Sequence, residues 1–341
     1  MAHYKLTFLG FGNVGRALAY LLLRKQDELQ ARYGFTFSVT GIATGRHGRA
    51  IDHHGIDLEQ AFALMRQGTD LSALSAFPAP DDMLKFIPAC GADVLFENTP
   101  VNYASGQPAI DHLRAALEAG MHAITANKGP LVHAYRDLSD LAHSKGRCFF
   151  YESTVMDGAP IFSLFRTALP AARLLALRAV LNSTTNLILT RMENGESFEQ
   201  AVAYAQTIGI AETDPSGDID GWDAAIKVAA LATVLMDFPI RPSEVERQGI
   251  RGITPQMIAT ASSQGKRWKL VCSARREDDH LITRVAPELV GADSPFYGIE
   301  NTTSLIQFET DVLGLLTIIE SDPGPHTTAY GLLADFINAV R

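Results

Sequence analysis

The residues from 205 to 227 (AQTIGIAETDPSGDIDGWDAAIK) place charged side chains between two apolar, alanine-rich runs. Charged groups are costly to bury unless they are paired, so an ordinary core segment would not contain so many. The charged residues are Glu212, Asp214, Asp218, Asp220, Asp223 and Lys227. The last two are four positions apart, so on a helix they share one face. A lysine held beside a carboxylate can give up a proton while a carbonyl group is reduced.

The alternative for Asp223 and Lys227 is a solvated ion pair on an exposed helix, which contributes about 0.2–0.5 kcal/mol. The neighbouring residues favour a functional pair over this alternative. Ala224, Ala225 and Ile226 lie between the two charges, and Val228 and Ala229 follow them. Such residues are typical of a buried helix rather than an exposed one.

Composition limits the class of protein. The chain has 341 residues, of which 47% are hydrophobic and 20% are charged, and its formal net charge is −9. This is the balance of a globular protein, and the negative charge argues against a nucleic-acid partner. The apolar run at 17–23 is too short to span a membrane, and no signal-peptide pattern precedes it. Cys90, Cys148 and Cys272 form no C-x-x-C pair, so we expect a reducing, cytoplasmic location.

A glycine-rich turn near the N-terminus predicts a dinucleotide site. A short apolar run at 5–9 is followed at once by Gly10-Phe11-Gly12-Asn13-Val14-Gly15, and an apolar-periodic helix follows from there. In this pattern the first glycine permits the tight turn, the second lets a pyrophosphate approach the backbone, and the third lets helix and strand pack closely. The phosphates then lie at the helix N-terminus, where free N–H groups favour an anion.

The rest of the chain predicts two domains. Strand-like and helix-like runs alternate over 1–150, which indicates an α/β, doubly wound parallel sheet of the Rossmann type. From about 151 to 324 the alternation is lost, and the runs predict an α+β substrate and dimerisation domain with a mostly antiparallel sheet. Helices are expected there at 158–168, 184–193, 197–207 and 221–236. The helix at 325–341 is expected to return to the first domain.

The end of the second strand bears on cofactor choice. An NAD site usually carries an acid there for the ribose hydroxyls, whereas this chain has Ala43-Thr44-Gly45-Arg46-His47. Arg46 can pair with a 2′-phosphate, which favours NADP and leaves NAD as the alternative. A solvated surface arginine is the other interpretation of this residue.

Four motifs resemble those of the homoserine dehydrogenase family. Thr125-Ala126-Asn127-Lys128 is similar to its T-A-N-K segment, and Glu152-Ser153-Thr154-Val155 is similar to its E-x-T-V turn. Asn182-Ser183-Thr184-Thr185-Asn186 is close to N-G-T-T-N. The stretch from Gly209 to Lys227 follows G-x-x-E-x-D-P-x-x-D-x-x-G-x-D-x-x-x-K in full. The resemblance covers nearly the whole chain.

The resemblance implies roles for matching residues. It makes Lys227 the proton donor to the nascent alkoxide, with Asp223 beside it and Lys128 at the junction of nicotinamide and substrate. Glu212, with the backbone of Gly209, would hold the substrate's amino group, and Asp218 and Asp223 would complete the substrate site. Thr99 and Gly324 would join the glycine turn at the cofactor. Glu152, Val155, Asp157 and Ala159 fall where the family binds a monovalent cation, Na⁺ or K⁺.

The activity implied is the reversible NAD(P)H-dependent reduction of L-aspartate 4-semialdehyde to L-homoserine. That step belongs to threonine, methionine and isoleucine biosynthesis. The family also implies a homodimer built through the second domain, and the regulatory domain of longer members is not expected here. We therefore expect a small amino-acid substrate and a homodimer, with neither a nucleic acid nor a membrane as a partner.

Departures from the family pattern leave a different substrate as an alternative. Met156 and Asp157 stand in a turn where the family has glycine or alanine, Ser183 replaces a glycine, and Trp222 replaces a smaller residue. Trp222 would either narrow the pocket or pack in the core. The alternatives are a related oxidoreductase acting on another small hydroxy or amino acid, and a nucleotide-binding regulatory protein without catalysis. Intact Lys128, Asp223 and Lys227 argue against the latter.

Overall fold

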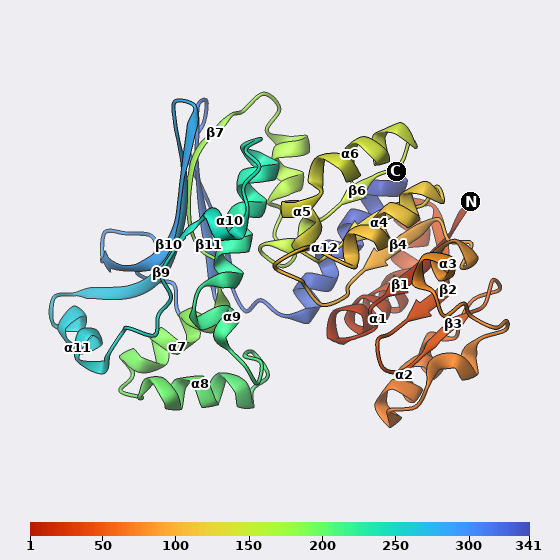
Figure 1. The fold of residues 1–341 in the computed structure, drawn as a ribbon, viewed down its shortest axis with the longest axis horizontal. Coiled ribbons are helices and arrows are strands. Elements are labelled where there is room, and N and C mark those ends of the chain that lie inside the picture. The colour runs from red at the N-terminus through yellow and green to blue at the C-terminus, as the bar shows by residue number, and fades with distance from the viewer. The chain divides into compact units, whose positions relative to one another are not determined.

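The computed structural model describes residues 1–341, and the chain divides into two compact units (Figure 1). Unit 1 contains Met1–Pro160 and Gly324–Arg341, and unit 2 contains Ile161–Pro323. Each unit holds one six-stranded sheet. One sheet is mostly parallel and the other mostly antiparallel, which confirms the predicted fold class.

The sheet of unit 1 has the strand order β3-β2-β1-β4-β5-β6. Its strands are β1 (Ala2–Leu9), β2 (Phe35–Ala43), β3 (Arg49–Ile51), β4 (Val94–Glu97), β5 (His122–Thr125) and β6 (Phe149–Phe150). All neighbours are parallel except β2 and β3. The strand order reverses between β1 and β4, and in sheets of this kind ligands bind outside the carboxyl ends of the strands at that point.

The helices of unit 1 follow the predicted alternation with local differences. They are α1 (Asn13–Glu28), α2 (Leu58–Gln67), α3 (Met83–Ala89), α4 (Ala109–Glu118), α5 (Gly129–His133), α6 (Tyr135–Ser144) and α12 (Pro325–Val340). The sequence predicts one helix at 130–145, but the structure has two, because Ala134 leaves helical geometry with φ −149°. α12, the last helix of the chain, packs against α1 (Figure 1).

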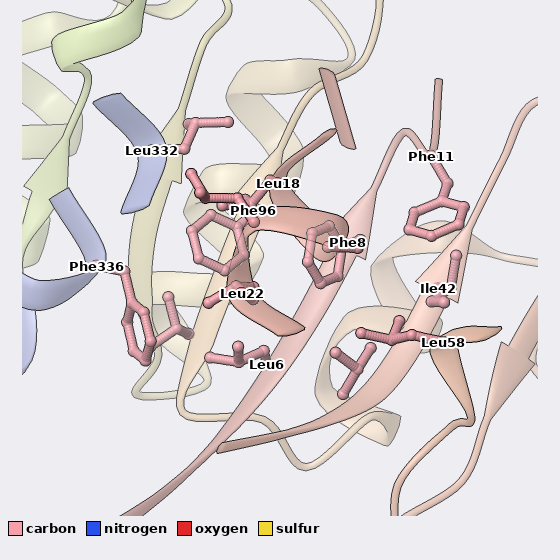
Figure 2. Packing of buried hydrophobic residues seen from close by; sticks show 14 of the residues in the cluster. Leu6, Phe8, Phe11, Leu18, Leu22, Ile42, Leu58, Phe96, Leu332 and Phe336 are labelled. Atoms are coloured by element: carbon pink, nitrogen blue, oxygen red, sulfur yellow. The ribbon is translucent and has the colours of Figure 1, made fainter. Parts of the chain in front are cut away.

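The core of unit 1 joins the sheet to its first and last helices. Figure 2 shows Leu6, Phe8 and Phe96 from the strands beside Leu22 from α1 and Phe336 from α12. The rings of Phe96 and Phe336 meet edge to face, with centroids 6.0 Å apart. All five side chains are fully buried. Burying such a side chain contributes about 1.5–3 kcal/mol, so this core fixes the strand ends that carry the glycine turn.

The sheet of unit 2 has the order β12-β11-β7-β9-β10-β8. Its strands are β7 (Leu174–Val180), β8 (Glu246–Arg247), β9 (Lys266–Glu277), β10 (His280–Gly291), β11 (Ser304–Thr310) and β12 (Gly314–Glu320). Neighbours are antiparallel except β8 and β10. α7 and α10 pack against β9, and α10 also contacts β10.

The helices of unit 2 are α7 (Ser183–Glu193), α8 (Phe198–Thr207), α9 (Ser216–Ile219), α10 (Trp222–Leu235) and α11 (Pro255–Ser263). The expected helix at 158–168 is only partly correct. Helix begins at Phe162, and its last five residues, Leu164–Ala168, form a π-helical turn. Pro160 explains the late start, since it lacks an N–H group and disfavours helical geometry in the residue before it. None of the helices combines the length and apolar character that crossing a membrane requires.

Candidate active site

The glycine turn between β1 and α1 has the geometry that a dinucleotide requires. Gly10 has φ +87°, and a Cβ there would lie 2.4 Å from the carbonyl oxygen of Asn98. A Cβ on Gly15 would lie 2.4 Å from the Gly10 carbonyl oxygen, whereas one on Gly12 would meet nothing within 4 Å. The first and third glycines therefore serve close packing, and the second leaves open space at the helix end.

The N-terminus of α1 is suited to an anion. Gly12 is the residue that caps the helix, no side chain accepts a hydrogen bond from its first turn, and that turn contains no acid. Its free N–H groups and the helix dipole favour a phosphate. The ring of Phe11 is buried and stacks on Phe62 with 6.0 Å between centroids, so of the predicted contacts Phe11 offers only its backbone. Asn13 is exposed and accepts a hydrogen bond from Arg16.

The segment after β4 carries an amide without a partner. The side-chain nitrogen and oxygen of Asn98 are both buried and make no hydrogen bond within the chain. Its backbone N–H donates to Leu9 O at 2.7 Å, which keeps this residue beside the glycine turn. Buried polar groups are nearly always paired, so an unpaired amide at a ligand-binding edge points to a ligand. Asn98 was not among the residues singled out from the sequence.

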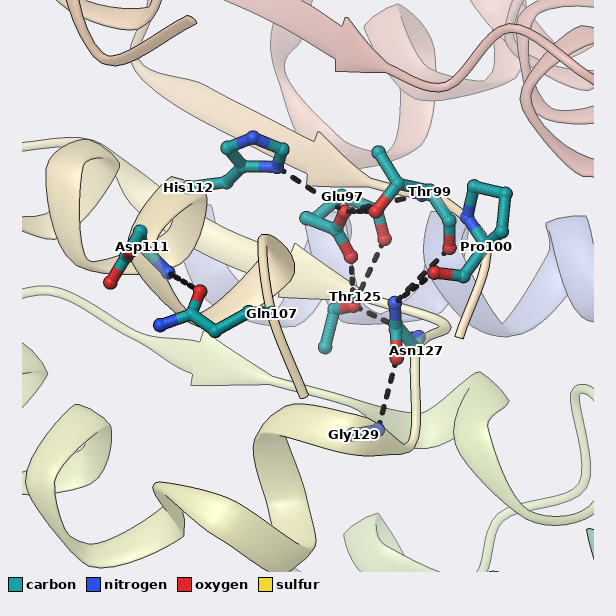
Figure 3. Close-up of polar contacts among 9 residues, drawn as sticks. All are labelled: Glu97, Thr99, Pro100, Gln107, Asp111, His112, Thr125, Asn127 and Gly129. Carbon is teal, nitrogen blue, oxygen red and sulfur yellow. Dashed lines mark hydrogen bonds and ion pairs between the residues drawn. The ribbon is translucent and has the colours of Figure 1, made fainter. Parts of the chain in front are cut away.

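Two loops at the same edge are tied together by a polar network (Figure 3). Asn127 donates from its amide to the carbonyl oxygens of Thr99 at 3.1 Å and Pro100 at 3.4 Å, and its Oδ1 accepts from the Gly129 N–H at 2.9 Å. Thr99 and Lys128, both predicted to meet the cofactor, are thereby held on adjoining loops. Gly324 lies at the start of α12, where its N–H donates to the Thr327 hydroxyl at 2.8 Å.

Arg46 lies on the turn between β2 and β3. Its side chain is exposed and forms no ion pair within the chain. The turn is closed by the Thr44 N–H, which donates to Gly48 O at 3.0 Å. The arginine therefore stands at the end of the second strand of the Rossmann sheet, where this fold places the adenosine ribose.

The ammonium–carboxylate pair is buried in unit 2. Lys227 Nζ lies 3.1 Å from Asp223 Oδ2, and both side chains are mostly buried on α10. Nζ also donates to the carbonyl oxygen of Leu181 at 2.5 Å. The i,i+4 pairing predicted from the sequence is thus present, and the end of the β7 segment fixes the lysine from a second direction.

Asn182 joins this pair to a second carboxylate. Its Nδ2 donates to Asp218 Oδ1 at 2.6 Å and to Asp223 Oδ2 at 3.1 Å. Its Oδ1 accepts from the Thr185 N–H at 2.8 Å and so caps α7. Burial raises the pKa of Asp218, and the nearby charge of Asp223 raises it further. The structure therefore brings Asp218, Asp223 and Lys227 into one cluster.

Glu212 and Gly209 lie outside this cluster. Both are exposed on the loop between α8 and α9, and no hydrogen bond or ion pair joins the Glu212 carboxylate to the three clustered residues. Trp222 is half-buried at the start of α10, where the guanidinium carbon of Arg247 lies 3.7 Å from the centre of its ring. That stacking gives the tryptophan a packing role within unit 2.

The turn that carries the expected cation residues belongs to unit 1 and rests on α12. The Glu152 N–H donates to buried Asp335 at 2.7 Å, and the Thr328 hydroxyl donates to the Asp157 carboxylate. Asp157 has φ +40°, a left-handed geometry that favours glycine. A Cβ on Gly158 would lie 2.4 Å from Thr327 O, so the turn packs closely on the helix.

Comparison with known proteins assigns both units to one family. Residues 160–337 match the family model for homoserine dehydrogenase, and residues 10–152 match the model for its NAD binding domain. The chain belongs to the homoserine dehydrogenase family. It is accordingly an NAD(P)-dependent oxidoreductase, as the sequence predicted.

Homoserine dehydrogenases are similar to this chain over its full length. A protein named NAD(+)-dependent homoserine dehydrogenase from Pseudomonas canavaninivorans is 36% identical over 99% of this chain and 96% of its own length. A homoserine dehydrogenase from Methanocaldococcus jannaschii is 35% identical over 98% and 97%. The crystal structure of a putative homoserine dehydrogenase from Archaeoglobus fulgidus superposes with a TM-score of 0.86 at 29% identity, covering 98% of both chains.

Within this homoserine dehydrogenase fold, the sequence motifs found the charged pair but missed the residues that hold it. Asn182 was recognised only as part of a motif, and Glu97, Asn98 and Asn127 were given no role. The hydrogen bonds from Glu97 to Thr125, from Asn127 to Thr99 and from Asn182 to Asp223 span 28 to 41 residues, and the Asn98 amide has no partner within the chain. The only local signal was the position of Glu97 and Asn98 at the carboxyl end of a predicted strand.

Proposed function

We propose that this protein catalyses the reversible NAD(P)-dependent interconversion of L-homoserine and L-aspartate 4-semialdehyde. The observation that carries the proposal is the buried Lys227–Asp223 pair on α10, bridged through Asn182 to Asp218. Together with the family assignment, it supports an acid–base site for an alcohol and an aldehyde. The step belongs to the synthesis of threonine, methionine and isoleucine.

The residues present fit the cofactor. Open space above Gly12, an uncapped α1 N-terminus and the unpaired Asn98 amide together support a pyrophosphate at the turn and a polar ligand group beside β4. NAD(P)H would supply the hydride. Thr99, Lys128 and Gly324 are proposed as further contacts to the cofactor.

Lys227 is proposed as the proton donor. Reduction of the aldehyde leaves negative charge on its oxygen, and a fixed ammonium stabilises that charge as it forms. Asp223 and the Leu181 carbonyl group hold Nζ in place, so little reorganisation is needed when the charge appears. Nζ then donates its proton to the oxygen, and the reverse reaction uses the neutral amine as the base.

The substrate's charged ends require opposite charges. We propose that Asp218 and Glu212, with the backbone of Gly209, hold the α-ammonium group, and that Lys128 faces the reacting end. Glu212 would have to leave solvent to do so, because its carboxylate is exposed on the α8–α9 loop. We also propose that the cofactor domain ends at residue 150 and that the substrate domain spans 151–324. The helix at 325–341 then returns to the cofactor domain.

We propose a preference for NADP, because Arg46 is exposed, unpaired and placed for a 2′-phosphate. The NAD(+) dependence of the Pseudomonas relative keeps NAD as the alternative. A monovalent cation, Na⁺ or K⁺, is proposed at the turn of Glu152, Val155, Asp157 and Ala159, where the backbone is fixed against α12. It would bind mainly through carbonyl oxygens.

A homodimer is proposed through the sheet of unit 2. β12 is an edge strand, and Leu315 and Ile319 on it are 65% and 56% exposed. Exposed apolar edge strands are usually covered, and a second copy of this chain is the proposed cover. The three cysteines are free, and Cys90 and Cys272 are buried, which supports a reducing cytoplasmic location.

The test is an assay of purified protein with L-aspartate 4-semialdehyde and each reduced cofactor, followed by loss of absorbance at the nicotinamide band. We expect turnover with the semialdehyde, and homoserine oxidation in the reverse direction. If the protein binds NAD(P)H but turns over only other small hydroxy or amino acids, the related-oxidoreductase alternative replaces this proposal. Binding without turnover of any such substrate would favour the regulatory alternative.

A further inference from the structure

Glu97 is a carboxylate with no exposure to solvent at the carboxyl end of β4. One of its oxygens, Oε1, accepts from the Thr99 N–H at 3.2 Å and from the Thr99 hydroxyl. The Thr125 hydroxyl shares its proton between the other oxygen, Oε2, at 3.1 Å and the Glu97 carbonyl oxygen at 2.9 Å. Figure 3 shows the carboxylate between the two threonines. A buried charge is costly unless it is well satisfied, and these hydrogen bonds satisfy both oxygens of the carboxylate.

The carboxylate links two loops that leave neighbouring parallel strands. Thr99 follows β4, and Thr125 ends β5 and accepts the Asn127 N–H at 2.9 Å on its hydroxyl oxygen. Asn127 in turn donates to the carbonyl oxygen of Thr99 at 3.1 Å and immediately precedes Lys128. The path from Thr99 through Glu97 to Thr125 and Asn127 therefore returns to Thr99, and every link in it is a hydrogen bond within the protein.

His112 of α4 flanks the carboxylate on its remaining side. Its Nδ1 lies 3.6 Å from Glu97 Oε1, and the ring is 6% exposed. The Nδ1 atom makes no hydrogen bond within the chain. The imidazole therefore shields the carboxylate from solvent on the α4 side.

We propose that Glu97 is a positioning residue for the nicotinamide end of the cofactor. The inference rests on the proposed function, because that function places Thr99 and Lys128 at the nicotinamide. In a sheet of this order the adenosine half lies on the β1–β2 side of the switch point and the other half lies over β4 and β5. The hydrogen bonds of the Glu97 carboxylate reach only Thr99 and Thr125, which lie on the β4 and β5 side, so we expect it to order the surface for the nicotinamide and to leave the adenosine surface unaffected.

The test compares wild type and Glu97→Gln in their dissociation constants for two ligands, measured by isothermal titration calorimetry. One ligand is the oxidised cofactor that the wild type binds more tightly, and the other is the same molecule without nicotinamide: ADP-ribose for NAD⁺, or 2′-phospho-ADP-ribose for NADP⁺. The glutamine keeps the shape but removes the negative charge and replaces one of the two acceptor oxygens with an N–H donor. We expect the dissociation constant of the cofactor to rise about tenfold, and that of the fragment to change by less than about twofold.

Two further variants separate positioning from loss of structure. Thr125→Val removes the hydroxyl that joins Glu97 to Asn127 and should reproduce the Glu97→Gln pattern, whereas Thr125→Ser keeps the hydroxyl and should bind both ligands as the wild type does. Glu118→Gln, on the exposed end of α4, is the surface control. If Glu97→Gln does not fold, the threonine pair carries the test.

An equal loss of affinity for both ligands, or no loss for either, would overturn the inference. Its failure is distinct from failure of the proposed function. A wild type that binds the cofactor but does not oxidise homoserine would refute the function and leave the binding comparison intact. Wild-type turnover with unchanged cofactor affinity in Glu97→Gln and Thr125→Val would refute only the role of Glu97.

Discussion

Replacing Asn182 with serine isolates the bridge between the two buried carboxylates of unit 2. Asn182 has two separable roles: its Oδ1 caps α7, and its Nδ2 donates to Asp218 at 2.6 Å and Asp223 at 3.1 Å. Serine is as good a helix cap as asparagine, but its shorter side chain cannot span two carboxylates. The variant therefore removes the bridge and retains the cap.

The magnitude follows from those two contacts. Hydrogen bonds to charged groups contribute about 1.5–3 kcal/mol each, and their loss also leaves two carboxylates to repel each other in a buried site. One of them, Asp218, already has a raised pKa, so protonation offers partial relief. We expect Asn182→Ser to lower the free energy of unfolding by about 3 kcal/mol at pH 7.5. Asn182→Ala should cost about 1 kcal/mol more through the lost cap.

The pH dependence gives the sign of the electrostatic part. The variant should raise the pKa of Asp218 beyond its wild-type value, so its folded state binds more protons than the wild-type folded state does. A folded state that binds extra protons is stabilised at low pH, and it loses this stabilisation as the pH rises through the pKa of Asp218 in the folded variant. The gap between wild type and Asn182→Ser, measured by urea unfolding, should therefore shrink from pH 7.5 to pH 5. A gap within about 0.5 kcal/mol at both pH values, or one that widens on acidification, would refute the bridge.

Three further predictions concern other parts of the chain. Gly12→Ala should leave the melting temperature unchanged, because a Cβ there meets nothing within 4 Å, but it should weaken dinucleotide binding at least about tenfold. Gly15→Ala should instead lower the melting temperature, because its Cβ would meet the Gly10 carbonyl oxygen. Equal melting temperatures for the two variants would contradict this prediction. Arg46→Ala should raise the KM for NADPH about tenfold and leave that for NADH unchanged; an unaltered ratio removes Arg46 from cofactor choice. Burial lowers the pKa of Lys269 to about 8, so between about pH 8 and 10.4 the lysine binds more protons in the unfolded state than in the folded state. The free energy of unfolding of the wild type should therefore rise over this range by about 3 kcal/mol relative to Lys269→Met. A gap that is flat over this range in urea unfolding would count against the buried ammonium.

The elements that the sequence predicted well are those with local signals. The sequence predicts a strand at 35–43 and a glycine turn at Gly10–Gly15, and both are correct, because residue alternation and glycine spacing are local signals. α11 was missed although Thr254-Pro255 is a typical helix start, with the threonine as the cap. α3 was missed because Pro88 interrupts its short apolar pattern, although Asp82 caps it.

The same distinction applies to the site. Asp223 and Lys227 were found because their contact is one helical turn long. Asn182 reaches Asp223 across 41 residues, and Glu97 reaches Thr125 across 28, so no sequence period relates them. Such contacts depend on which strands become neighbours in the sheet, and that is decided by packing of the whole unit rather than by any local pattern.

The role of Lys227 is tested most directly by the kinetics of Lys227→Ala with homoserine and the preferred oxidised cofactor. We expect kcat to fall by a factor of about 10³ or more, because both charge stabilisation and proton transfer are lost, while the dissociation constant of the cofactor stays within about twofold of the wild type. Lys266→Ala, an exposed lysine of the same unit, should keep wild-type rates. A Lys227→Ala enzyme with an unaltered kcat would contradict the assignment of the proton donor.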